Sequence, residues 1–269
     1  MNVPDTLGII AGNGVYPRLL ADSARKAGVK KVIAAAFSDE TDSALTKHVD
    51  LIEWMRVGQL SRLLYFFREN RIHHAIMAGQ IAPGNLFDLR PDWKALLLLA
   101  RLKQRSAESI FAAIADELAK VEVDLLPATS FLEDYLAPVG LLAGPKLSAR
   151  EQEDVDLGSK TAKEIARLDI GQTVIVKNGT VLAVEALEGT NEAIKRGGGL
   201  ARKDAVMVKV AKPNQDMRFD VPVIGVETMR IAEEVKVRVV ALEAGKTLLL
   251  EKEAILELAN RSNISIVGR

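Results

Sequence analysis

Residues 7–17 have the sequence LGIIAGNGVYP, a short apolar run followed by Gly12-Asn13-Gly14 and then by a proline. The apolar run predicts a buried strand, and Pro17 suits the first turn of the helix that follows. The alternation continues along the first half. It predicts further strands at residues 31–37, 49–55, 75–78 and 124–127, and helices at 17–27, 58–70 and 106–120. Strands that alternate with helices predict a parallel sheet with right-handed crossovers.

The second half has a different pattern. Residues 173–177 and 180–185 flank Asn178-Gly179, which favours a type I′ hairpin turn because both central residues need positive φ. Ser148 and Glu151 form a capping-box pattern at the start of a helix to about residue 168. Further strands are predicted at 205–211 and 237–241, and helices at 227–235 and 251–260.

The segment 136–148, with two prolines and two glycines, marks a domain boundary. The predicted fold is therefore α/β. A parallel-sheet domain spans residues 1–140, and a distinct C-terminal domain, α+β or α/β and expected to be the catalytic one, spans residues 141–269.

The composition excludes several classes of function and site. Lys+Arg and Asp+Glu are equal at 36 each, whereas a general nucleic-acid binder would carry a basic excess, so no nucleic-acid partner is expected. The chain has no cysteine, which excludes disulfides, thiolate metal sites and thiol nucleophiles. The first residues lack the pattern of a signal peptide, and no apolar run reaches the roughly 20 residues of a spanning helix. A cytoplasmic protein is expected.

The longest mainly apolar run is residues 95–102, which Arg101 interrupts and Lys103 and Arg105 follow. It predicts a buried helix. Two alternatives are an apolar wall for an acyl chain and a surface that contacts a membrane.

Two glycine segments of the first half are candidate ligand contacts. Gly12-Asn13-Gly14 lies between a strand and a helix, a geometry that can direct N–H groups at an anion, with a plain tight turn as the alternative. The third position of a dinucleotide fingerprint holds Pro17, so classical NAD binding is disfavoured. Gly79-Gln80 follows a predicted parallel strand, where ligands collect in open α/β sheets. An ordinary loop is the alternative there.

The second half adds two glycine-containing segments. Glu188-Gly189-Thr190-Asn191 follows the hairpin and leads into a helix that Thr190 could cap. Gly197-Gly198-Gly199 predicts either a flexible loop, such as a lid hinge, or a place where backbone must approach closely.

The segment QDMRFDVP, residues 215–222, is the richest in charge. In an extended chain Asp216, Arg218 and Asp220 would point to one face. Such a row can hold a divalent cation while the arginine binds phosphate. Hydrolysis of a pyrophosphate requires both functions. A solvated charged turn is the alternative.

Taken together, these segments resemble a known family, the UDP-2,3-diacylglucosamine pyrophosphatases of the LpxI type in lipid A synthesis. The resemblance follows the family's order over nearly the whole chain and rests on GNGVYP (12–17), MAGQ (77–80), DIGQ (169–172), AVEALEGTN (183–191) and QDMRFDVPVIG (215–225). It implies a Rossmann-like domain, a second domain, and a substrate held between them. It also implies a divalent metal, magnesium with manganese as the alternative. The products would be UMP and 2,3-diacylglucosamine 1-phosphate (lipid X), with water attacking the phosphorus on the sugar side.

The resemblance makes Asp220 the critical acid. It is expected to bind the metal or to orient the attacking water, with Asp216 and Arg218 in support. One position departs from the family pattern. In the family the segment that corresponds to residues 183–191 usually ends in Asp, whereas this chain has Asn191, which cannot neutralise charge. The expected substrate-binding residues are Gly12, Asn13, Gly14, Gly79, Gln80, Glu188, Gly189, Thr190, Asn191, Lys209 and Gln215.

The implied partner is a lipid-linked UDP-sugar. Contact with the inner-membrane surface and a homodimer are further expectations. Two other functions stay open at this point: a non-catalytic nucleotide-sugar binding or regulatory module, which would not need Asp216 or Asp220, and a nicotinamide-dependent oxidoreductase, against which the interrupted fingerprint speaks.

Overall fold

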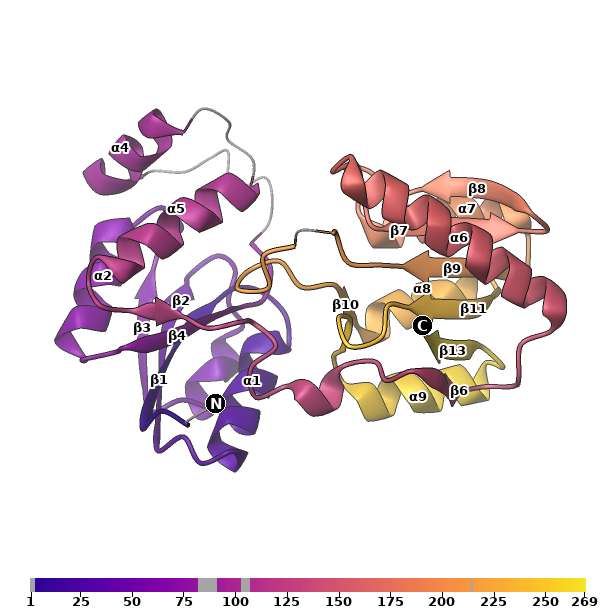
Figure 1. Ribbon diagram of the computed structural model, residues 1–269. Helices are drawn as coiled ribbons and strands as arrows, with labels where there is room; N and C mark the ends of the chain where they lie inside the picture. The colour runs from indigo at the N-terminus through magenta and orange to yellow at the C-terminus, as the bar shows by residue number, and fades with distance from the viewer. Residues whose placement is uncertain (1–2, 82–90, 103–106, 214) are drawn as a thin grey trace. The chain divides into compact units, whose positions relative to one another are not determined.

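The computed structural model describes residues 3–81, 91–102, 107–213 and 215–269 (Figure 1). The chain divides into two compact units. Unit 1 contains residues 1–132 together with Asp216–Asp220, and unit 2 contains Glu133–Gln215 together with Val221–Arg269. The sequence placed the end of the first domain at residue 140. The contacts place it at Leu132 and also assign a short piece of the second half to unit 1.

The sheet of unit 1 is entirely parallel, and its strand order follows that of a Rossmann-type fold on both sides of the switch point. The predicted α/β fold class is confirmed. In spatial order the strands are β3 (Leu51–Met55), β2 (Lys31–Phe37), β1 (Thr6–Ala11), β4 (His74–Ala78) and β5 (Asp124–Leu125). The order reverses between β1 and β4. Ligands bind at the carboxyl ends of the strands at such a point.

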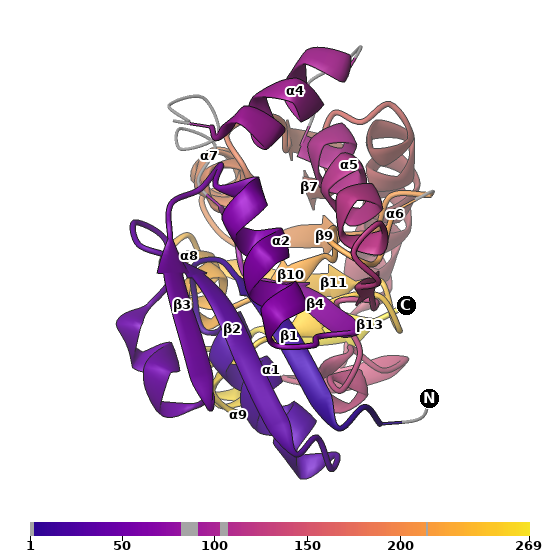
Figure 2. The same cartoon turned by 90° about the vertical axis from the view of Figure 1, so that its left-hand side faces the viewer.

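Helices cover both faces of this sheet. The helix α1 (Tyr16–Lys26) packs against β1, β2 and β4. The helices α2 (Leu60–Glu69) and α5 (Ala107–Ala119) share a core with alternate residues of the strands, among them Ile33, Ala35 and Phe37. A 3₁₀ turn, η1 (Ser43–Lys47), precedes β3. Figure 2 shows α2 in front of the strands and α1 behind them.

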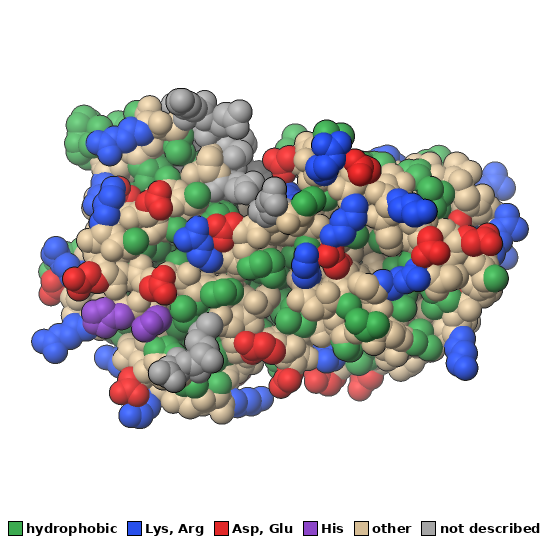
Figure 3. All heavy atoms as spheres, in the orientation of Figure 1, with side chains coloured by type: hydrophobic (Ala, Val, Ile, Leu, Met, Phe, Trp, Pro, Cys, Tyr) green, Lys and Arg blue, Asp and Glu red, His purple; other side chains and the backbone are tan. Residues whose placement is uncertain are grey.

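The apolar run at 95–102 forms most of α4 (Trp93–Arg101), but the prediction of a buried helix is wrong. Leu96 and Leu97 are 47% and 39% exposed and Trp93 is 73% exposed, whereas Ala95 is buried. Green side chains gather over this helix in Figure 3. The run is long enough to cover all sides of a helix, but α4 packs on one side only.

The sheet of unit 2 is mixed. In spatial order its strands are β6 (Gly140–Ala143), β13 (Ser265–Gly268), β11 (Val237–Leu242), β9 (Ala205–Lys209), β7 (Thr173–Lys177) and β8 (Thr180–Val184). The inner pairs β11–β13 and β9–β11 are parallel, and the outer pairs are antiparallel. A second, two-stranded sheet pairs β10 (Val223–Ile224) with β12 (Leu248–Leu249).

Both faces of the six-stranded sheet are covered, so its strands are apolar on both sides. Val174 and Val176 pack on α6 (Ala149–Arg167), whereas Ile175 between them faces the opposite core. That core is closed by α7 (Thr190–Ala201), α8 (Val226–Glu234) and α9 (Lys252–Arg261). A short 3₁₀ turn, η2 (Glu133–Tyr135), opens the unit. No helix in the described part of the chain is long and apolar enough to cross a membrane.

The capping box at the start of α6 is confirmed, since Ser148 Oγ accepts from Glu151 N and the Glu151 side chain accepts from Ser148 N. The hairpin is confirmed as well: Asn178 and Gly179 have φ of 54° and 74°. A buried carboxylate of α6 holds that turn. Asp154 accepts hydrogen bonds from the amides of Asn178 and Gly179 at 2.8 and 2.7 Å.

The Asp154→Ala substitution is expected to destabilise the protein by about 2–3 kcal/mol, because two charge-assisted hydrogen bonds are lost. Urea unfolding followed by circular dichroism measures the change. The exposed neighbour Glu153 offers a matched control, and Glu153→Ala should stay within about 0.5 kcal/mol of the wild type. Equal midpoints for the two variants would refute the proposed role of Asp154.

The glycines at 197–199 lie inside α7, so the prediction of a flexible loop or lid hinge is wrong. A Cβ on Gly197 would lie 2.6 Å from the Ile175 Cβ, and one on Gly198 would lie 2.2 Å from a methyl group of Val235. The alternative prediction of close approach is confirmed at these two positions, where the helix packs directly on its neighbours.

Candidate active site

At the carboxyl edge of the unit 1 sheet, the loop after β1 and the residues after β4 hold each other. Gly12 N donates to Ala78 O at 2.8 Å, and Asn13 N donates to Gln80 O at 2.7 Å. Gln80 N donates back to Asn13 O at 3.3 Å. The predicted loop and the predicted strand end are thus adjacent.

The two glycines at this crossing are required by the backbone. A Cβ on Gly12 would lie 2.5 Å from Gln80 O, and one on Gly79, at φ 93°, would lie 2.5 Å from Asn13 O. Because Gly14 N also donates to Asn13 Oδ1 at 2.6 Å, the amides of residues 12–14 are all used within the unit. Contact between this loop and an anion stays a prediction. Asn13 and Gln80 present exposed side chains at this edge, and Gly14 and Gly79 are exposed beside them.

The acid segment folds as a turn, so the prediction of an extended row at residues 216, 218 and 220 is wrong. Phe219 N and Asp220 N both donate to Asp216 O, at 3.2 and 3.0 Å. The cause is local: the Asp216 side chain accepts from Arg218 N at 3.1 Å, and an aspartate that bonds backbone two residues on closes a turn.

Within this turn Asp216 and Arg218 pair with each other. Arg218 Nε lies 2.9 Å from Asp216 Oδ1, and Arg218 Nη2 lies 2.6 Å from Oδ2, a bidentate arrangement. The hydrogen bonds from Arg218 lower the pKa of Asp216, and those to Asp216 raise the pKa of Arg218. Asp216 is therefore an ionised partner that orients Arg218, and Asp220 is the acid of the segment outside this pair.

Two contacts fix the turn onto the rest of unit 1, and a third holds one of its partners, Ala128. Ala128 N donates to Met217 O at 2.7 Å, and Ala128 O accepts from the Tyr16 hydroxyl at 2.5 Å. Burial raises the pKa of Tyr16, so its hydroxyl stays protonated and donates. The Phe219 ring contacts Phe111, with the ring centroids 5.7 Å apart. The Ala128 peptide thus links the start of α1 to the acid turn.

Unit 2 carries a second polar cluster, at the end of β9. Lys209 is buried, and its Nζ donates to Thr190 Oγ1 at 2.6 Å. The Thr190 hydroxyl donates to Glu185 Oε1 at 2.8 Å, and Glu185 Oε2 accepts from Gln172 N at 3.3 Å. The prediction that Thr190 caps α7 is wrong: Gly189 is the N-cap residue, and the threonine hydroxyl serves the lysine instead.

Three other predicted site residues make bonds within unit 2. Glu188 accepts from Arg196, whose hydrogen bond lowers the pKa of the glutamate. The Asn191 side-chain carbonyl accepts from the Thr228 hydroxyl at 2.9 Å, which ties α7 to α8. Gln215 Oε1 accepts from Lys212 N at 2.8 Å, while its buried Nε2 has no partner among the described residues.

The structure therefore divides the predicted site into two groups. Unit 1 holds Gly12, Asn13, Gly14, Gly79, Gln80 and the turn Asp216–Asp220, and unit 2 holds Glu188, Gly189, Thr190, Asn191, Lys209 and Gln215. The sequence missed the importance of Tyr16, Phe111 and Glu185. For the first two it offers no signal, since their contacts are long-range. For Glu185 the signal is Gly171, a position where a Cβ would lie 2.1 Å from the Glu185 carbonyl oxygen, so only glycine fits beside it.

These features define a two-unit α/β protein that has a Rossmann-type first sheet and an acid turn contributed by the second half of the chain. The model of the LpxI N-terminal domain matches residues 6–135, and that of the LpxI C-terminal domain matches residues 138–267. The chain belongs to the LpxI family.

One relative is the UDP-2,3-diacylglucosamine pyrophosphatase LpxI of Caulobacter vibrioides. It is 28% identical over 97% of this chain and 96% of its own length. Among solved structures, an L-amino acid ligase from Bacillus licheniformis matches with a TM-score of 0.28 and 14% identity, over 68% of this chain and 39% of its own. The structure of gox2253 matches with a TM-score of 0.30 and 10% identity, over 95% and 87%.

Proposed function

We propose that this protein hydrolyses the pyrophosphate of UDP-2,3-diacylglucosamine to UMP and 2,3-diacylglucosamine 1-phosphate, a step of lipid A synthesis. The observation that carries the proposal is the match of both units to the two LpxI domains, together with a relative of that activity that aligns over 97% of the chain.

In the proposed reaction, water attacks the phosphorus on the sugar side, and the bridging oxygen leaves with UMP. Asp220 orients the water and accepts its proton. Arg218, held by Asp216, and Lys209, held by Thr190, offset the charge that develops on the phosphate oxygens. Asn13 and Gln80 contact the nucleotide at the carboxyl edge of the first sheet.

The proposal includes a divalent metal, magnesium with manganese as the alternative. The described residues contain no group of three or more His, Cys, Asp or Glu that could hold one. In the proposal Asp220 would be the protein ligand, and substrate phosphates and water would complete the shell, a common arrangement for magnesium. When bound, the metal would neutralise charge on the pyrophosphate.

Removal of divalent metal is therefore expected to reduce turnover about a hundredfold or more, because the phosphate charge is no longer offset. The protein would be treated with EDTA, dialysed, and assayed with and without added magnesium or manganese. Full turnover after chelation would contradict the metal proposal and leave the hydrolase proposal standing.

The activity itself is tested by phosphorus NMR of UDP-2,3-diacylglucosamine with purified protein and magnesium in oxygen-18 water. Appearance of UMP together with sugar 1-phosphate that carries the heavy oxygen is the expected result. Tight substrate binding with no product would favour the alternative, a non-catalytic nucleotide-sugar binding or regulatory protein.

A lipid substrate also leads us to propose a cytoplasmic protein that contacts the inner-membrane surface. The exposed Trp93, Leu96 and Leu97 of α4 are the candidate contact. Co-sedimentation with anionic phospholipid vesicles tests it, and a Leu97→Ser variant that sediments as well as the wild type would refute it. A homodimer remains part of the proposal, to be measured by light scattering.

A further inference from the structure

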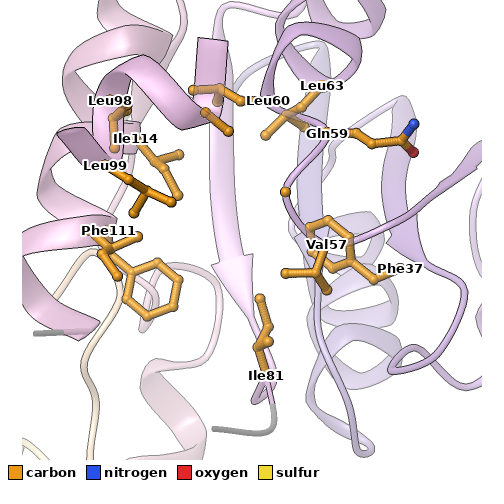
Figure 4. Close-up of a pocket in the computed structure, with 13 residues that line it drawn as sticks. Phe37, Val57, Gln59, Leu60, Leu63, Ile81, Leu98, Leu99, Phe111 and Ile114 are labelled. Atoms are coloured by element: carbon orange, nitrogen blue, oxygen red, sulfur yellow. The ribbon is translucent and has the colours of Figure 1, made fainter. Parts of the chain in front are cut away.

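A pocket in unit 1 is lined almost entirely by hydrocarbon (Figure 4). Leu98 and Leu99 of α4 and Phe111 and Ile114 of α5 form one wall. The polar side chain at its rim is Gln59, whose Oε1 already accepts from Arg56 N at 2.7 Å. Among the described residues that line the pocket none carries a charge, so the lining offers no charged group to a phosphate.

The pocket lies at the ligand-binding edge of the parallel sheet. Phe37 ends β2, and Val57 and Ile81 follow the ends of β3 and β4. Ligands of open α/β sheets bind at this edge. An apolar lining at such a place is suited to an apolar part of a ligand.

The pocket is also joined to the acid turn. Phe111 lines the pocket, and its ring contacts Phe219, the residue before Asp220. A chain in the pocket would therefore lie one side chain away from the candidate catalytic segment.

We infer that this pocket binds an acyl chain of the lipid substrate. The inference rests on the proposed function, since the relative acts on a sugar with two acyl groups. A chain that enters the pocket leaves water for a hydrocarbon surface. Each buried methylene then strengthens binding about fourfold, the equivalent of about 0.8 kcal/mol.

The inference predicts that acyl-chain length and pocket volume compensate each other. Ala95 is buried and lines the pocket, so Ala95→Phe should fill part of it. With substrates of increasing acyl length, kcat/KM of this variant should fall about tenfold or more for long chains, and little for the shortest. Leu98→Ala enlarges the pocket and should shift the preference toward longer chains.

Ala100→Phe is the matched control, because Ala100 is exposed on the same helix and does not line the pocket. Its chain-length profile should equal that of the wild type. Equal profiles for Ala95→Phe, Leu98→Ala and the control would overturn the inference, as would a uniform loss at every chain length.

A binding measurement separates this inference from the proposed function. The full-length protein is titrated with 11-(dansylamino)undecanoic acid, and dansyl fluorescence is followed. Wild type and Ala100→Phe should bind the probe, and Ala95→Phe should bind it at least tenfold more weakly. Such binding without pyrophosphate hydrolysis would refute the proposed function and support the pocket. Hydrolysis together with equal probe binding by all variants would support the proposed function and refute the assignment of the pocket.

Discussion

Asp220→Ala is expected to lower kcat by about a thousandfold or more while the affinity for UDP-2,3-diacylglucosamine stays within about threefold. Asp216 is ionised but committed to Arg218 through both of its oxygens, so it cannot replace the missing acid. The turn itself should survive, because it is held by Asp216, Met217 and Phe219. The loss would then report on chemistry rather than on folding. Single-turnover kinetics and calorimetric titration separate the two effects.

Asp5→Ala is the control for Asp220→Ala. Asp5 is an exposed carboxylate before β1, at the opposite edge of the same sheet, and its ion pair with Lys30 lies in solvent. Its removal should leave kcat unchanged. Turnover near the wild-type value in Asp220→Ala would remove Asp220 from the catalytic role. A loss confined to substrate affinity would make it a binding residue.

Much of the architecture was readable from local sequence. In unit 1, strands and helices alternate along the sequence. In unit 2, the Asn178-Gly179 turn and the Ser148–Glu151 capping box are signals that act within four residues. Such signals survive folding because a turn or a cap is satisfied by its own neighbours. The glycine loop lies beside Gln80 because the carboxyl ends of parallel strands share one edge.

The parts that could not be read depend on partners far along the chain. The turn Asp216–Asp220 belongs to unit 1 because Met217 and Phe219 bind Ala128 and Phe111. Strands of two residues, such as β10, are too short for a periodic pattern. The composition of Gly197 and Gly198 favours a loop, yet both lie in a helix. Glycine is needed at these positions because Ile175 and Val235 leave no room for a side chain.

The second large effect is expected in unit 2, where Lys209→Met should lower kcat/KM about a hundredfold. An ammonium is costly to bury, yet Lys209 is only 8% exposed. Its bond to Thr190, which Glu185 orients, holds the charge at one place at the end of β9. A cation held in this way can stabilise phosphate charge without reorganising during the reaction. Methionine keeps the apolar stem and removes the charge.

Lys177→Met is the matched control. Lys177 ends β7, which runs antiparallel to β9, so it lies at the opposite edge of the sheet from Lys209. Its Nζ donates to the carbonyls of Ala201 and Lys203. It should lower the melting temperature and leave kcat/KM within about twofold. Thr190→Val should cost about tenfold in kcat/KM, and combining it with Lys209→Met should add little, since both act through one cation. Additive losses would show that the threonine acts independently of the lysine. A Lys209→Met variant that loses only stability, as the control does, would reduce Lys209 to a structural residue.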